Sequence, residues 1–261
     1  MPATVEFLGV KFDAVDQGAT LDAIRWLSHG NSFSYIVTPN VDHIVRLHEG
    51  GGVTMLQDAY AKADLRVCDS RILQTLAHRS GRDLPLVTGS DLTAQLVKDM
   101  SRKGGRLAVV GGDALLVSQL RSRYAAIEWE HHEPPMGVRD DPEARERIAS
   151  FVEECQASIV LFCIGFPQSE ITCAEIKAGG RAAGVGLCVG ASLEFLVGRK
   201  RRAPWAMQAA NLEWLFRLAS EPKRLWRRYL IEGPRIFAIW LNWRRSIPPR
   251  DGSGSNPSDA S

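Results

Sequence analysis

The sequence lacks paired cysteines, the spacing of a metal site and a signal-peptide pattern. Its five cysteines form no CxxC pair and are odd in number, so no disulfide framework is expected. Four of them lie in or beside apolar runs, which predicts reduced, buried thiols in a cytoplasmic protein. The histidines have no ligand spacing with these cysteines, so no metal site is expected. The first ten residues have no basic start and contain Glu6, so no signal peptide is expected either.

Several common nucleotide-binding and catalytic motifs are also missing. No G-x-G-x-x-G follows the first predicted strand, which weighs against a dinucleotide-dependent dehydrogenase. Residues 184–190 (GVGLCVG) have the wrong spacing for that motif and include a strand. The chain has no P-loop and no G-x-S-x-G. No DxD stands at the end of a predicted strand, so charge on a phosphorylated substrate would have to be neutralised by arginines and helix N-termini.

Positive charge and tryptophan are concentrated near the C-terminus. Residues 199–245 hold twelve Lys or Arg against three Glu, a net charge of +9, whereas residues 1–198 carry a net charge of −6. The same segment holds five of the seven tryptophans, and Trp with Arg on helices suits the edge of an anionic bilayer. Its longest apolar run, residues 236–241, is far below the ~20 residues of a spanning helix.

These features predict three parts in the chain. Residues 1–198 form the main domain, residues 199–246 form a basic, membrane-associating helical appendage, and the Pro/Gly/Ser-rich residues 247–261 form a disordered tail. A basic helix pair packed on the body is one alternative for the appendage. Nucleic-acid binding is another, and the acidic body weighs against it.

Strand and helix patterns alternate through the main domain. Strands are predicted at residues 5–12, 34–38, 65–68, 106–110, 127–130, 158–164 and 185–189, with helical patterns between them. The helix that begins within residues 87–91 has Ser90 as its expected cap. Residues 158–164 are almost wholly apolar, as in a strand buried on both faces. The alternation predicts an α/β fold with a Rossmann-like, mostly parallel sheet covered by helices.

Polar residues gather where the predicted strands end, which is where ligands bind in open α/β sheets. Asp69 ends an apolar strand and is the candidate general base, because partial burial there would raise its pKa towards neutral pH. An N-cap on the following helix is an equally good alternative. Asn40 is either a turn residue or a ligand contact. The other polar strand ends are Thr38, Gly111-Gly112-Asp113, residues 168–170 and residues 192–194.

Seven ordered motifs resemble the WecG/TagA/CpsF family of bacterial glycosyltransferases over nearly the whole chain. The most specific is NLEWLFRLASEPKRLWRRY at residues 211–229. The others are TPN (38–40), ADLRVCDS (63–70), VTGSDL (87–92), VVGGD (109–113), GFPQSE (165–170) and VGASLEFLVGRKRRAP (189–204).

The resemblance implies an inverting enzyme that transfers a sugar from a UDP-sugar to a polyprenyl-diphosphate-linked sugar on the inner face of the cell membrane. It implies that Asp69 is the base, with Thr38 and Asn40 in the same pocket. Glu194 stands where the family usually has an Asp near the uracil. The remaining residues expected to bind the donor are Gly111, Gly112, Asp113, Gln168, Glu170, Arg217, Arg224 and Arg227. No cofactor, metal or nucleic acid is expected, and a homo-oligomer is left open.

Four positions depart from the family pattern. Ser70 follows Asp69 where the family usually has Gly, and Ser169 takes the place of a Gln. Leu86 stands near the usual position of an Arg, and Glu194 replaces an Asp. The donor sugar therefore stays open among N-acetylmannosamine, N-acetylmannosaminuronic acid, glucose and glucuronic acid. A nucleotide-binding membrane scaffold with weakened catalysis is the alternative function.

Overall fold

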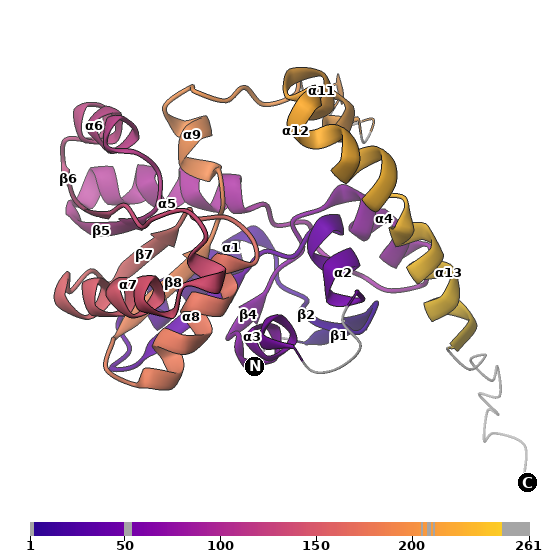
Figure 1. Cartoon of the computed structure of the whole chain (residues 1–261), viewed down its shortest axis with the longest axis horizontal. Coiled ribbons are helices and arrows are strands. Elements are labelled where there is room, and N and C mark those ends of the chain that lie inside the picture. Colours follow the sequence, from indigo (N-terminus) through magenta and orange to yellow (C-terminus); the bar gives the residue numbers. More distant parts are fainter. Residues whose placement is uncertain (1–2, 50–53, 205, 208–209, 211, 247–261) are drawn as a thin grey trace, which may run out of the picture.

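The protein has an α/β fold, which the computed structural model describes for residues 3–49, 54–204, 206–207, 210 and 212–246. Within these residues, six parallel strands form a sheet in the order β4-β3-β8-β7-β5-β6, with helices around it (Figure 1). This arrangement confirms the predicted Rossmann-like sheet. The strands are β3 (Phe33–Val37), β4 (Leu65–Arg66), β5 (Gly105–Val110), β6 (Ile127–His132), β7 (Ile159–Phe162) and β8 (Gly184–Cys188).

The predicted strand at residues 5–12 was wrong, because the chain forms an antiparallel hairpin there. Strands β1 (Thr4–Phe7) and β2 (Val10–Asp13) pair outside the main sheet. Leu8 and Gly9 connect them with φ values of 52° and 72°. Two successive positive φ angles are typical of the tight turns that suit the twist of a hairpin. The alternation of apolar residues continues through the turn, so it concealed the reversal of the chain.

Helices cover the sheet in two layers, because successive side chains of a strand point to opposite faces. Ile36 belongs to the core formed with helices α1, α5 and α6, whereas Tyr35 and Val37 belong to the core on the other face. The first layer contains α1 (Gln17–Leu27), α5 (Gly89–Lys103) and α6 (Ala114–Arg123). The second contains α2 (Val41–Leu47), α3 (Met55–Lys62), α4 (Arg71–His78), α7 (Pro142–Glu154) and α8 (Gln168–Gly179). Short helices lie at η1 (Val138–Asp140) and α9 (Ser192–Leu196).

The basic C-terminal segment forms a chain of helices along one side of the molecule, next to α2 and α4 (Figure 1). It consists of α11 (Glu213–Ser220), α12 (Pro222–Arg227), the π-helix η2 (Arg228–Glu232) and α13 (Arg235–Ser246). None of the described helices is both long and apolar enough to cross a bilayer. The predicted disordered tail, residues 247–261, lies outside the described residues.

One face of α13 packs on the body of the protein. Ile236 is 1% exposed, and the ring of Trp243 meets the ring of Phe7 edge to face at 5.0 Å. The Nε1–H of Trp240 donates a hydrogen bond of 2.8 Å to the hydroxyl of Ser80. These contacts join the C-terminal helix to the N-terminal hairpin and to the end of α4.

The C-terminal helices also expose large apolar side chains, of which Leu230 and Phe237 line a second cavity described below. These residues, called the exposed apolar stripe below, are Leu215, Trp226, Leu230, Ile231, Phe237 and Leu241. Basic side chains lie beside them, including Arg227, which is 73% exposed. Several exposed apolar residues on one segment suit contact with an apolar partner, and that contact stays a prediction.

Candidate active site

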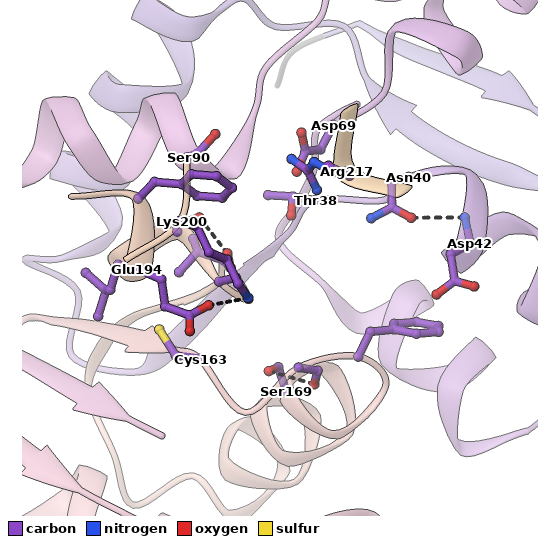
Figure 2. Close-up of a pocket in the computed structure, with 18 of the residues that line it drawn as sticks. Thr38, Asn40, Asp42, Asp69, Ser90, Cys163, Ser169, Glu194, Lys200 and Arg217 are labelled. Atoms are coloured by element: carbon purple, nitrogen blue, oxygen red, sulfur yellow. Dashed lines mark hydrogen bonds and ion pairs between the residues drawn. The ribbon is translucent and has the colours of Figure 1, made fainter. Parts of the chain in front are cut away.

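The main cavity lies at the carboxyl edge of the sheet and has a volume of about 970 Å³. Its walls come from the segments after β3, β5, β7 and β8, from the N-terminus of α8 and from α11, α12 and η2 (Figure 2). From β3 the chain continues to the edge strand β4 on one side. The neighbour of β3 on its other side is β8, which the chain enters from β7. A crevice forms where the strand order reverses in this way, and such crevices bind ligands.

Asp69 lies in the wall of this cavity, partly buried, beside Thr38 and Gly89. The backbone N–H of Gly89 hydrogen-bonds to its carboxylate. Thr38 Oγ1 and Asp69 Oδ2 lie 3.5 Å and 3.7 Å from the point that a Cβ on Gly89 would occupy. Burial raises the pKa of Asp69 from 3.8 to about 7, although the charge of Arg217 and the Gly89 N–H oppose this rise. A carboxyl with this pKa can accept a proton near neutral pH.

Two expected helix caps were assigned to the wrong residues. The alternative that Asp69 caps α4 was wrong, because the hydroxyl of Ser70 accepts the hydrogen bond from the N–H of Leu73. The expectation that Ser90 caps α5 was also wrong. The hydroxyl of Thr88 accepts from the Asp91 N–H, so the helix begins two residues earlier than expected. Asp69 is therefore free of capping and faces the cavity.

Thr38 and Asn40 lie in the same part of the cavity (Figure 2). The buried hydroxyl of Thr38 donates to the backbone carbonyl of Cys188 at 3.0 Å. The side-chain oxygen of Asn40 caps α2, because it accepts from the N–H groups of Asp42 and His43. Asn40 is thus a helix cap that also lines the cavity, and its contact with a ligand stays a prediction.

The structure brings two of the three expected arginines to the cavity. Arg217, on α11, pairs with Glu213 at 2.6 Å and points towards Asp69 (Figure 2). Arg224, on α12, lines the cavity as well. Arg227 is not among the residues that line the cavity.

Arg228 lines the cavity in place of Arg227 and was missed by the sequence analysis. Its Nε lies 3.4 Å from Asp42, a residue near the start of α2. The adjacent arginines in the motif RRY at residues 227–229 were the available signal. They lie where α12 passes into the π-helix η2, so an α-helical period does not identify which of the two faces the body.

The opposite end of the cavity holds a Glu194–Lys200 ion pair, with 2.5 Å between the nitrogen and the oxygen (Figure 2). Asp113 lies in the same wall. It caps α6 by accepting from the Leu116 N–H and pairs with Arg199 at 2.8 Å. The arginine lowers the pKa of this carboxyl below its ordinary value.

The other expected donor-binding residues lie at different depths. Gly112 and Glu170 line the cavity, whereas Gly111 and Gln168 do not. A Cβ on Gly111 would lie 2.8 Å from Ile164 Cγ2, and its φ is +94°, so packing requires glycine there. The side-chain amide of Gln168 donates to the Ile164 carbonyl and accepts from a backbone N–H. These two hydrogen bonds fix the position of the first turn of α8.

A second cavity, of about 630 Å³, meets the main cavity at Asp69 and Arg217. It lies between the segment that begins α4 and the C-terminal helices. Its lining is richer in apolar residues than that of the main cavity, and these include Val41, Ile72, Leu86, Trp214, Leu230, Pro234, Ile236 and Phe237. Asp69 therefore stands at the junction of a polar cavity and a more apolar one.

The cysteines and potential metal ligands do not form a site within the described residues. All five cysteines are free, and four of them are buried. No group of three or more His, Cys, Asp or Glu in this part of the chain is placed to hold a metal ion. The cavity offers Asp69, whose raised pKa lets it accept a proton near neutral pH, and several cations that can neutralise an anion.

A proton acceptor beside arginines, at the carboxyl edge of a parallel sheet, is suited to group transfer from a phosphorylated donor. The sequence model of the Glycosyl transferase WecG/TagA/CpsF family matches residues 5–249. The chain belongs to this family, as its motifs predicted.

Relatives from Staphylococcus aureus cover most of the chain. The protein of strain MRSA252 named N-acetylglucosaminyldiphosphoundecaprenol N-acetyl-beta-D-mannosaminyltransferase is 26% identical over 239 residues, which are 86% of this chain and 88% of that protein. The protein of the same name from strain MW2 is 25% identical over 236 residues, with the same coverage.

Proposed function

We propose that this protein is an inverting glycosyltransferase that moves a hexose from a UDP-sugar to a polyprenyl-diphosphate-linked saccharide, in the synthesis of a cell-surface polysaccharide or exopolysaccharide. The observation that carries the proposal is the position of Asp69. Its carboxyl has a pKa of about 7 and lies at the junction of two cavities, with Arg217 nearby. The family membership and the names of the relatives support a lipid-linked acceptor.

The proposed reaction is a single displacement. The carboxylate of Asp69 accepts the proton of an acceptor hydroxyl, whose oxygen then forms a bond to C1 of the donor sugar. The bond from C1 to the phosphate oxygen breaks at the same time, and UDP leaves with the electron pair. Attack from the face opposite UDP inverts the configuration at C1. Arg217 and Arg224 neutralise the charge that develops on the diphosphate.

The two cavities provide separate places for the two substrates. The polar main cavity, with its arginines and the Glu194 end, suits the nucleotide and its sugar. The second cavity suits the acceptor, because its apolar lining can cover the first part of a polyprenyl chain. Asp69 contributes to both walls, which is what a base between donor and acceptor requires.

The C-terminal helices account for contact with the membrane in this proposal. The exposed apolar stripe and its flanking arginines can lie at the surface of an anionic bilayer, on the inner face of the cell membrane where the lipid-linked acceptor is presented. In this structure Arg224 forms an ion pair with Glu221, and Arg228 forms one with Asp42. Docking on the membrane is proposed to release these arginines towards the diphosphate and so to gate activity. Full turnover by Arg224→Ala on membranes would contradict the gating.

Calorimetry tests the donor and the proposed independence from metal. Wild-type protein is titrated with UDP-N-acetylmannosamine, UDP-N-acetylmannosaminuronic acid, UDP-glucose and UDP-glucuronic acid, each in EDTA and in Mg²⁺. We expect one donor to bind most tightly, with the same affinity in both buffers, because arginines neutralise the diphosphate. Binding in Mg²⁺ alone would overturn the metal independence, and binding of none of them, with vesicles present, would overturn the UDP-sugar assignment.

A further inference from the structure

Glu170 is a buried carboxyl in the wall of the main cavity that the proposed reaction does not use. It is the third residue of α8, near the helix N-terminus, and is 2% exposed. Its Oε2 has no hydrogen-bond partner in the described part of the chain. No Lys or Arg among the described residues forms an ion pair with it. A buried polar atom without a partner is costly, so its presence in a cavity wall points to a ligand that supplies the partner.

The titratable groups that the charge of Glu170 affects are neutral at pH 7. The groups that its charge affects are the phenol of Tyr60 on α3 and the thiols of Cys173 and Cys188 on α8 and β8. Burial raises the pKa of each of these groups, so all three are neutral at pH 7. The hydroxyl of Tyr60 forms a hydrogen bond of 2.7 Å with Nδ1 of His43 on α2. Burial lowers the pKa of that histidine, so it is neutral too.

Glu170 is itself protonated at neutral pH, because burial raises its pKa to about 8 and no cation opposes the rise. A protonated carboxyl has one O–H donor and also accepts hydrogen bonds. It therefore matches a group that both accepts and donates, such as a hydroxyl or an amide.

Glu170, at the start of α8, and Asp69 line the same cavity. The charge of Glu170 raises the pKa of the Cys188 thiol. The carbonyl of Cys188 accepts from the hydroxyl of Thr38, and Thr38 and Asp69 both lie beside Gly89. Figure 2 shows Ser169, the neighbour of Glu170, across the cavity from Asp69. A sugar whose C1 is within reach of an acceptor at Asp69 would therefore extend towards the start of α8.

We propose that Glu170 is a sugar-binding residue that acts as a neutral carboxylic acid and forms hydrogen bonds with an uncharged hydroxyl or acetamido group of the donor sugar. This inference rests on the proposed function and names the residue that distinguishes a UDP-sugar from UDP. Ionised Glu170 would lose its O–H donor and place an unpaired charge against the sugar.

Calorimetry with UDP, UDP-N-acetylmannosamine and UDP-glucose tests the inference in wild type, Glu170→Gln and Glu170→Ala at pH 7.0 and at pH 9.0. The ratio of the affinities for the tighter UDP-sugar and for UDP isolates the contribution of the sugar. We expect this ratio to fall about tenfold in Glu170→Ala at pH 7.0, and to stay near the wild-type value in Glu170→Gln, because an amide also donates and accepts. UDP affinity in each variant reports whether the cavity is intact.

The dependence on pH separates a sugar contact from a structural role. Raising the pH to 9.0 should lower the affinity ratio of wild type, because Glu170 ionises. The same change of pH should lower the ratio of Glu170→Gln by a smaller factor, because glutamine does not ionise. Any fall that remains in Glu170→Gln belongs to another group, such as Asp69. An unchanged ratio in Glu170→Ala, or an equal fall with pH in wild type and Glu170→Gln, would overturn the inference. Failure of wild type to bind UDP or either UDP-sugar would overturn the proposed function and the inference with it.

Discussion

Replacing Asp69 by asparagine should make the protein more stable while it abolishes transfer. The rise of the Asp69 pKa from 3.8 to about 7 means that the folded protein keeps a proton there after the unfolded chain has lost it. Stability therefore falls as the pH rises from about 4 to about 7 and is level above that range. This rise corresponds to at most about 4 kcal/mol, since one pKa unit is about 1.4 kcal/mol. Asparagine does not ionise and still accepts the Gly89 N–H.

Urea unfolding of wild type and Asp69→Asn at several pH values measures this effect. The variant should gain little stability at pH 4 and up to about 4 kcal/mol at pH 8, and subtracting the two curves removes the contributions of all other groups. Asp83→Asn, at an exposed aspartate, is the matched control and should show no such trend. An Asp69→Asn protein that is less stable than wild type at pH 8, or that transfers sugar at the wild-type rate, would refute the role of this carboxyl as a buried base.

Three further predictions concern the cations, the C-terminal helix and the glycine turn. Arg217→Ala should lower kcat about a hundredfold in a transfer assay, because a donor to the leaving diphosphate is lost, whereas Arg102→Ala at the exposed end of α5 should not; equal rates in the two would contradict this. Trp243→Ala should lower the free energy of unfolding in urea by about 2 kcal/mol. Trp226→Ala should change that free energy by no more than about 0.5 kcal/mol but should weaken sedimentation with anionic vesicles. The reverse pattern would place α13 away from the body. Gly111→Ala should destabilise by about 3 kcal/mol in the same unfolding assay, and a neutral result would contradict the close packing.

Much of the fold followed from local patterns in the sequence. The apolar strand at β7 and the alternation of strands with amphipathic helices were enough to predict a parallel sheet covered on both faces. The hairpin of β1 and β2 was not predictable in this way. Its turn uses Leu8-Gly9 in place of the common Asn-Gly or Asp-Gly pair, and the apolar alternation runs through it.

The site was predictable where a residue's position depends on a strand end. Asp69, Thr38 and Asn40 follow predicted strands and do meet in one cavity. Residues on the C-terminal helices were harder to assign, because their placement depends on helix register. The change from α12 to the π-helix η2 brings Arg228, and not Arg227, to the cavity.

Contacts between distant segments had no local signal at all. The packing of Trp243 against Phe7 joins the two ends of the described chain, and neither side chain indicates the other in the sequence. The same applies to the unpartnered oxygen of Glu170. Its motif identified the residue, but only the surrounding helices show that the carboxyl is buried among neutral groups.

A transfer assay on vesicles tests whether the protein is a glycosyltransferase with Asp69 as its base. The vesicles carry polyprenyl-diphosphate-linked N-acetylglucosamine, and the protein is given each of the four UDP-sugars in EDTA, with the lipid product analysed by mass spectrometry. We expect wild type to add one sugar from one of these donors with inverted configuration at C1, and Asp69→Asn to form no product. Product formation by Asp69→Asn at the wild-type rate would contradict the account. So would the absence of product from every donor while UDP still binds, a result that would favour a nucleotide-binding scaffold.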